Sequence, residues 1–271
     1  MVSMLVIKGT VSFGQSTKIT SMFVMETNFA FFAELHLFYE DGSHVVEVSD
    51  NKWRVAPSAT LLANIYASET HDRRLYPIGW DAPGFDDKSW KLAKGLTGPR
   101  GALKYQIILH ETFTPIKEIS SRPGTICIDL GQNSSIMTEI EVEGEAGSET
   151  IIRYEETTHE DGIICMPVPL FKEFETKVYS KFILAGTGGK EHWTPDFCFT
   201  GARYIQIEGV RNAKFTESKL PILHSVCGRH VSSAPSRLGT MKTDKNEVKA
   251  LLSALKWTSS SNLFSYHTVC P

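Results

Sequence analysis

The side chains best suited to chemistry are concentrated in the last third of this 271-residue chain. Arginine can donate paired hydrogen bonds to a carbonyl or an oxyanion, histidine can exchange a proton, and an aromatic ring offers a flat apolar wall. The candidate catalytic residues are Arg203, His192 and His267, and the candidate substrate-binding residues are Trp193, Trp257, Phe264 and Tyr266. An alternative for His192, Trp193 and Arg203 is that they only close a β-sandwich.

Three aspartates, Asp81, Asp86 and Asp87, lie in one turn-rich stretch at residues 76–90. Paired carboxylates can act as acid and base or bind calcium. The stretch lacks the alternating oxygen ligands of a calcium loop, however, and aspartates commonly hold turns through bonds to the backbone. We therefore expect these aspartates to be structural.

No sequence motif for a metal or a nucleotide cofactor is present. There is no HExxH, no phosphate-binding loop and no GxGxxG after a strand. The GTGG at residues 186–189 lies between predicted strands and is expected to form a hairpin turn. Neither a metal nor a cofactor is therefore expected.

The composition argues against two classes of partner. The chain is 41% hydrophobic and 22% charged with a formal net charge of −3, which gives no electrostatic reason to bind nucleic acid or an anionic membrane. No apolar run approaches the roughly 20 residues that a membrane-spanning helix needs. The N-terminal MVSMLVIKGTVSFG lacks the pattern of a secretion signal, and the five cysteines are odd in number and widely spaced. We expect a cytoplasmic protein with reduced thiols.

Period-two alternation with turn punctuation dominates the chain. Residues 31–38 and 44–48 are predicted to be strands joined by a glycine-containing turn. Further strands are predicted at residues 125–130, 137–142, 150–154 and 203–207. Short strands at this spacing predict a mainly β fold of two antiparallel, jelly-roll-like β-sandwich modules followed by one C-terminal helix.

The helix is predicted over residues 243–257. Asp244 with Glu247 three residues later is a capping-box arrangement, and apolar residues then recur at helical spacing through Leu255. Turn-forming residues near 95–103 and 226–240 suggest boundaries. The expected domains are a first, shortened module (1–98), a second module (99–228), and a linker, helix and tail (229–271).

One long segment carries a family resemblance. The run IYASETHDRRLYPIGWDAPGFDDKSWKLA, residues 65–93, contains an acidic residue, an Asp-x-Arg, a Gly-Trp-Asp and a Gly-Phe-Asp-Asp before a tryptophan. In this order it resembles the α-L-rhamnosidases of glycoside hydrolase family 78. Matching segments follow in the family's order at residues 123–133, 153–162, 191–209, 224–244 and 256–271. The resemblance implies the β-sandwich front part of such an enzyme.

The resemblance also implies which catalytic groups are missing. In the family the last segment runs through an Asp-Cys-Pro whose aspartate is a carboxylate of the sugar subsite, and here that position is Val269. The family's general acid lies a few residues beyond this Cys-Pro, and its second carboxylate lies far downstream in an (α/α)6 barrel. Glycoside hydrolysis needs two carboxylates flanking the scissile bond. We therefore expect no rhamnosidase activity.

Three functions remain open, and the first is the one that we favour. The first is a cofactor-independent pericyclase of secondary metabolism, of the hetero-Diels–Alder type, because small fungal enzymes of that kind have about this size and need only an apolar cleft with one or two hydrogen-bond donors. The second is a carbohydrate-binding module that contacts sugar through exposed aromatics such as Trp80 and Trp193. The third is an inactive fragment of a rhamnosidase. The expected partner is a small molecule or, as the alternative at the C-terminal end, a second copy of the chain.

Overall fold

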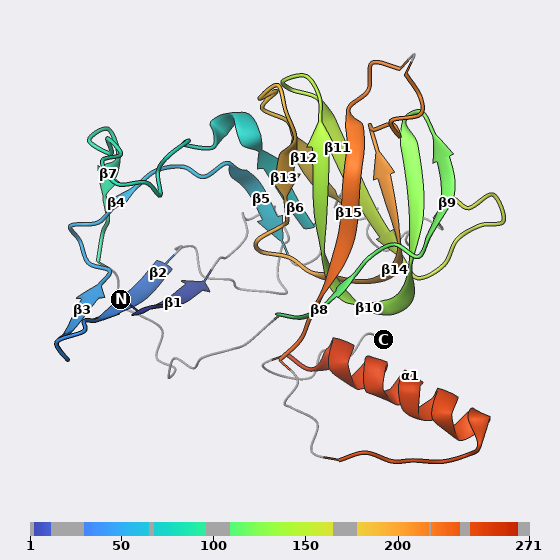
Figure 1. The fold of residues 1–271 in the computed structure, drawn as a ribbon. Helices are drawn as coiled ribbons and strands as arrows, with labels where there is room; N and C mark the ends of the chain where they lie inside the picture. The colour runs from blue at the N-terminus through green and yellow to red at the C-terminus, as the bar shows by residue number, and fades with distance from the viewer. Residues whose placement is uncertain are drawn as a thin grey trace, which may run out of the picture. The chain divides into compact units, whose positions relative to one another are not determined.

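The computed structural model describes residues 3–11, 30–64, 68–95, 109–164, 178–216, 218–233 and 239–264. The chain forms two compact units, one of residues 1–59 and 75–105 and the other of residues 60–74 and 106–271 (Figure 1). The mainly β class with one C-terminal helix is confirmed. The linear division at residues 98 and 228 did not anticipate that residues 60–74 leave the first unit and join the second.

The first unit contains two small antiparallel sheets. One sheet is formed by β1 (Ser3–Val11), β2 (Ala30–Phe38) and β3 (His44–Val48), and the other by β4 (Arg54–Val55) and β7 (Lys91–Leu92). The predicted β2–β3 hairpin is confirmed. Its turn places Gly42 at φ +82°, and the Asp41 carboxylate accepts a hydrogen bond from the Ser43 amide at 2.9 Å.

The second unit is built on a ten-stranded sheet. Its strands are β5 (Thr60–Asn64), β6 (Ser68–Asp72), β8 (Leu109–Phe113), β9 (Lys117–Arg122), β10 (Thr125–Glu143), β11 (Glu149–Glu155), β12 (Ser180–Ile183), β13 (Glu191–Trp193), β14 (Thr200–Glu208) and β15 (Ile222–Val231). The order is β5-β6-β12-β11-β14-β10-β15-β8, with β9 and β13 also paired to β10. Among the pairings between these strands in the described residues, only that of β6 with β12 is parallel. A short 3-10 turn, η1 (Arg73–Leu75), follows β6.

Strand β10 bends the sheet on itself. Its register against β14 shifts between Asp129 and Ser134, and Gly131 in this interval has φ +80°. Before the shift, residues 125–129 pair with β9 and β14; after it, residues 134–136 pair again with β14, residues 136–143 pair with β15, and residues 140–142 pair with β13. Apolar side chains of both halves enter one hydrophobic core, so the halves face each other as in a sandwich. The two strands predicted at 125–130 and 137–142 are therefore one continuous strand.

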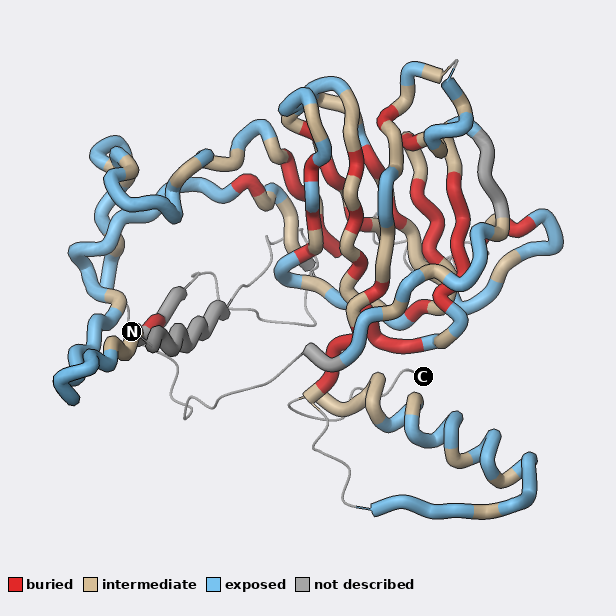
Figure 2. Tube along the Cα trace, in the orientation of Figure 1, coloured by how far each residue is buried: buried red, intermediate tan, exposed pale blue. Residues whose placement is uncertain are grey.

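The core of the second unit is tightly closed. Figure 2 shows the buried residues gathered inside this unit, and Ile136, Ile140, Phe182 and Ile205 have no exposed surface. Gly209, at φ +76°, follows β14 where the chain passes β11. A Cβ atom at this position would lie 2.2 Å from the Glu149 carbonyl oxygen, so only glycine fits.

The connection at residues 186–189 is not a hairpin turn as predicted. Strands β12 and β13 flank it but pair with different strands. The Glu191 carboxylate fixes the connection by accepting hydrogen bonds from the amides of Ala185, Gly186 and Thr187. The connection therefore leads the chain from one set of strand partners to another.

Helix α1 (Asn246–Asn262) is shifted from its predicted position. The residue at its N-cap is Lys245, which makes no side-chain capping bond, so the predicted Asp244–Glu247 capping box is wrong. The helix also continues past Trp257 through a serine-rich stretch. Ser232 Oγ donates to the Ser260 carbonyl at 2.5 Å, and the Ser135 amide donates to Ser261 Oγ at 3.2 Å. In the described part of the chain, no helix is long and apolar enough to cross a membrane.

Candidate functional site

Arg203, on β14, is engaged by a carboxylate. Its Nε and Nη2 groups each donate to an oxygen of Asp129, on β10, at 2.8 Å. The Gly131 amide donates to the same carboxylate at 2.6 Å. The hydrogen bonds from Arg203 hold the pKa of Asp129 below its usual range. The Arg203 donors that were expected to bind a substrate carbonyl thus already form a bidentate salt bridge with Asp129. The Arg203 side chain is 39% exposed.

His192, on β13, lies on the solvent side of its strand. Its side chain is 65% exposed, with Nε2 3.1 Å from Glu141 Oε2. Lys190 also contacts Glu141, at 2.5 Å, and its hydrogen bond lowers the pKa of this carboxyl group. The His192 ring is thus exposed to solvent while it contacts Glu141.

Trp193 points in the opposite direction, into the core. It is 6% exposed and stacks on Phe182 with ring centroids 5.3 Å apart, and the His71 ring lies 6.1 Å away. Successive residues of a strand face opposite sides, which explains why His192 is exposed and Trp193 is not. The expectation that Trp193 offers an exposed ring to a sugar is wrong.

Aromatic residues near the C-terminus contact rings elsewhere in the second unit. Trp257 lies 5.5 Å from both the Phe113 and His230 rings, and Phe264 stacks on Phe199 at 4.2 Å. Tyr266, His267 and Val269 lie outside the described residues. Within the described ranges, no hydrogen bond or ring contact joins the predicted site residues Arg203, His192 and Trp257 to one another.

A buried acid was not anticipated from the sequence. Glu69, on β6, has no exposed surface, and its Oε2 accepts hydrogen bonds from the amides of Asp196 and Phe197 at 2.9 and 3.0 Å. Burial raises the pKa of Glu69 to about 7. Nearby, Thr60 Oγ1 lies 3.2 Å from His71 Nδ1. Glu69 lies in the polar run SETHD, which has the pattern of a solvated segment, and its burial follows only from tertiary structure.

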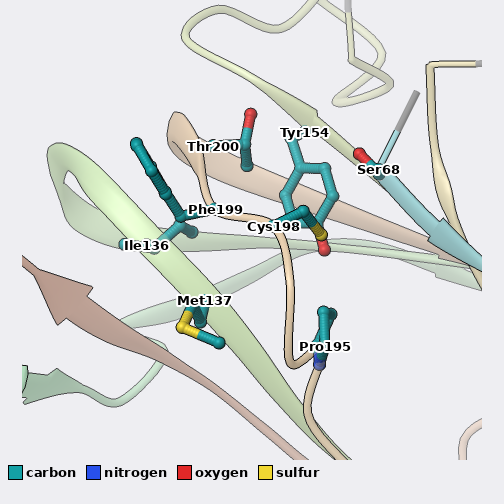
Figure 3. Close-up of a pocket in the computed structure, with 8 residues that line it drawn as sticks. All are labelled: Ser68, Ile136, Met137, Tyr154, Pro195, Cys198, Phe199 and Thr200. Carbon is teal, nitrogen blue, oxygen red and sulfur yellow. The ribbon is translucent and has the colours of Figure 1, made fainter. Parts of the chain in front are cut away.

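A small hollow includes Ser68, the residue that precedes Glu69 in the sequence (Figure 3). It is lined by Ser68, Ile136, Met137, Tyr154, Pro195, Cys198, Phe199 and Thr200. Burial raises the pKa of the Cys198 thiol to about 12 and also raises the pKa of Tyr154. The hollow offers about 0 Å³ to a water-sized sphere, so it has no room for a ligand.

A second hollow is more open. It holds about 210 Å³ and is lined by Glu143, Gly144, Glu145, Gly188, Arg211, Lys219, Leu220 and Ile222. Its lining mixes acids, bases, glycines and two aliphatic residues. This hollow also lies in the second unit, at the end of β10.

In the first unit, residues 76–90 form a series of turns. Asp86 Oδ1 accepts a hydrogen bond from the Lys88 amide at 3.1 Å, and Asp87 lies 3.6 Å from Arg54 Nε, which agrees with structural roles. The Trp90 ring packs edge-on against Phe85. Trp80 is 45% exposed, and its Nε1 donates to the Tyr76 hydroxyl at 2.8 Å.

The described residues contain no cluster of side chains that could bind a metal ion. Within the described ranges, no group of three or more His, Cys, Asp or Glu side chains is arranged to hold a metal ion. Cys127, Cys198 and Cys227, the cysteines in those ranges, are free thiols.

The fold and the packing define a β-sandwich protein with a second, smaller β-rich unit. The descriptions of known families agree with this assignment. Residues 119–232 match the bacterial alpha-L-rhamnosidase concanavalin-like domain, and residues 1–111 match the alpha-L-rhamnosidase N-terminal domain. The chain belongs to the bacterial α-L-rhamnosidase family and corresponds to its N-terminal portion.

Individual relatives give the extent of this similarity. An alpha-L-rhamnosidase of Streptomyces avermitilis is 29% identical over 251 residues, which are 89% of this chain and 23% of that protein. The structure of the alpha-L-rhamnosidase from Dictyoglumus thermophilum aligns with a TM-score of 0.73 and 30% identity, over 89% of this chain and 26% of that one. The Streptomyces avermitilis enzyme complexed with L-rhamnose aligns with a TM-score of 0.72 and 27% identity, over 88% and 22%. The chain thus spans about a quarter of the length of these relatives.

Proposed function

We propose that this chain is a non-catalytic, carbohydrate-binding portion of an α-L-rhamnosidase. The supporting similarity is confined to the family's N-terminal and concanavalin-like domains. One structural relative was solved with L-rhamnose bound. A rhamnoside is therefore the class of ligand that we assign to the chain.

The observation that carries this proposal is Trp80 of the first unit, an exposed tryptophan whose ring is held by a hydrogen bond. Sugars expose a flat array of C–H groups, which packs on the face of an aromatic ring, while their hydroxyls bond to polar atoms nearby. The Trp80 ring is 45% exposed, and the hydrogen bond from its Nε1 to the Tyr76 hydroxyl holds it in one orientation. A ring held in place loses less conformational entropy on binding than a mobile one.

The observations support a pericyclase less well than a carbohydrate-binding protein. Such an enzyme needs an apolar cleft that aligns its reactants. The hollow beside Ser68 has no space for a ligand, and the hollow at the end of β10 has charged residues around it. The arginine that was expected to activate a carbonyl is paired with Asp129. No observation favours the pericyclase over the carbohydrate-binding function.

The test is a binding titration of L-rhamnose and an aryl α-L-rhamnoside by calorimetry and intrinsic fluorescence. We expect weak binding that quenches tryptophan fluorescence, and we expect Trp80→Ala to weaken it about tenfold, as for the loss of an aromatic contact. Ile78→Ala is the matched control. It removes a side chain from the same loop that is 84% exposed but has no ring. Unchanged affinity in Trp80→Ala, or no binding by the unaltered chain, contradicts the proposal.

A further inference from the structure

The open hollow of the second unit has the features of a small polar binding site. Its acids are Glu143 and Glu145, its bases are Arg211 and Lys219, and Gly144 and Gly188 form part of its wall. Gly188 has no atom within 4 Å of the position that a Cβ would take, so its side of the hollow is open to solvent. A ligand can approach the backbone there without meeting a side chain.

The rim of the hollow is held by backbone hydrogen bonds. The Arg211 amide donates to the Pro221 carbonyl at 2.8 Å, and the Leu223 amide donates to the Arg211 carbonyl at 3.0 Å. In another part of the sequence, the Ser148 amide donates to the Glu145 carbonyl at 3.1 Å. Segments from two parts of the sequence that line the hollow are thus held by backbone hydrogen bonds, which lowers the ordering cost of binding.

Two of the charged groups are also oriented. Glu143 Oε2 lies 2.9 Å from His224 Nε2, and Arg211 Nε donates to the Leu220 carbonyl at 3.0 Å. Two carboxylates and two cations around one small space give no net attraction for an anion or a cation. They provide both acceptors and donors, which is what the hydroxyl groups of a neutral polyol need.

The volume of the hollow and its two aliphatic residues limit the class of ligand further. The hollow, of about 210 Å³, is smaller than the roughly 300–1,000 Å³ of sites for drug-sized ligands, which favours one sugar ring over an oligosaccharide. Leu220 and Ile222 add an apolar edge that can cover a methyl group. We propose that this hollow binds one 6-deoxyhexose ring, with its hydroxyls toward the charged residues and its methyl toward the aliphatic pair. This inference rests on the proposed carbohydrate binding and adds a second site.

The experiment compares L-rhamnose with L-mannose, which carries a hydroxymethyl where rhamnose has a methyl, by amide chemical shifts of the full chain. We expect rhamnose to shift the amides of Glu145 and Gly188 and mannose to bind there several-fold more weakly. Glu145→Gln and Lys219→Ala should each weaken binding at these amides about fivefold. The control is Glu160→Gln, an exposed acid outside the hollow, which should change nothing.

The outcomes separate this inference from the proposed function. If the chemical shifts change only around Trp80 and Glu145→Gln has no effect on them, the proposal that the hollow binds sugar is wrong. The proposed carbohydrate binding by the first unit then still stands. Equal affinity of rhamnose and mannose at the hollow overturns the role of the methyl group. The absence of any shift at high millimolar sugar overturns both the inference and the proposed function.

Discussion

Glu69 is a buried acid whose titration affects the stability of the chain between acidic and neutral pH. It is fully buried, two backbone amides donate to it, and burial raises its pKa from 4.5 to about 7. The charged and titratable groups around it are Asp196, His71, Tyr154 and Cys198. Between pH 4.5 and 7 the folded chain therefore retains a proton on Glu69 that the unfolded chain releases.

Because the folded state binds this extra proton, stability falls as the pH rises through this window. Glu69→Gln keeps an oxygen for the two amides and removes the titration. We expect the variant to gain stability relative to the unaltered chain from about pH 5 to pH 8, by about 3 kcal/mol at most. Urea unfolding across this range measures the difference, and Glu160→Gln is the control. A difference that does not change with pH would show that Glu69 does not titrate there.

The titration of His71 changes the stability with pH in the opposite direction to that of Glu69, so the effects of the two residues can be distinguished. Burial lowers its pKa from 6.5, and the nearby Arg73 adds to this. Below pH 6.5 the unfolded chain takes up a proton that the folded chain resists, so stability is lost as the pH falls. Glu69→Gln should leave this acid-side loss in place. The sequence identified neither residue as perturbed, because burial depends on pairing between distant segments.

Among the elements, helix α1 is positioned by contacts that the sequence pattern does not contain. Its apolar spacing predicted a helix, but its last turn is stabilised by bonds from Ser232 and Ser135 to Ser260 and Ser261. Alternation similarly predicted the strands and not their partners. It missed the bend that joins two predicted strands into β10 and the parallel pairing of β6 with β12. Local sequence specifies an element, whereas its partner is chosen by long-range packing.

Trp257 is the residue of α1 that contacts the sandwich through two rings. Trp257→Ala removes its packing on Phe113 and His230, and we expect a loss of about 2 kcal/mol and faster hydrogen exchange along the helix. Leu255→Ala is the matched control, because this side chain is 54% exposed and should cost less than about 0.5 kcal/mol. Unchanged exchange in Trp257→Ala would mean that the serine contacts alone hold the helix.

At the scale of the whole molecule, family membership was predictable from the sequence because its motifs are local runs in a fixed order. The resemblance found in residues 65–93 and the later segments is confirmed by matches to both family domains. The candidate site was less predictable. Arg203, His192 and Trp193 were grouped because they are close in sequence, yet their side chains meet Asp129, Glu141 and Phe182 respectively. Neighbours in a strand alternate between its two faces, which separates such a group.

The final prediction is that these 271 residues alone do not hydrolyse an aryl α-L-rhamnoside. Hydrolysis needs one carboxylic acid on the leaving oxygen and a second carboxylate on the opposite side of the sugar, about 5–9.5 Å away. The matched domains are the family's N-terminal and concanavalin-like domains, and the resemblance assigns the catalytic pair to later parts of the family's sequence. Aryl alcohol release should equal the blank, with the longer Streptomyces avermitilis relative as the positive control. Release that follows the protein through different columns, and is absent from a preparation without it, would show that a carboxylate pair within this chain is catalytic.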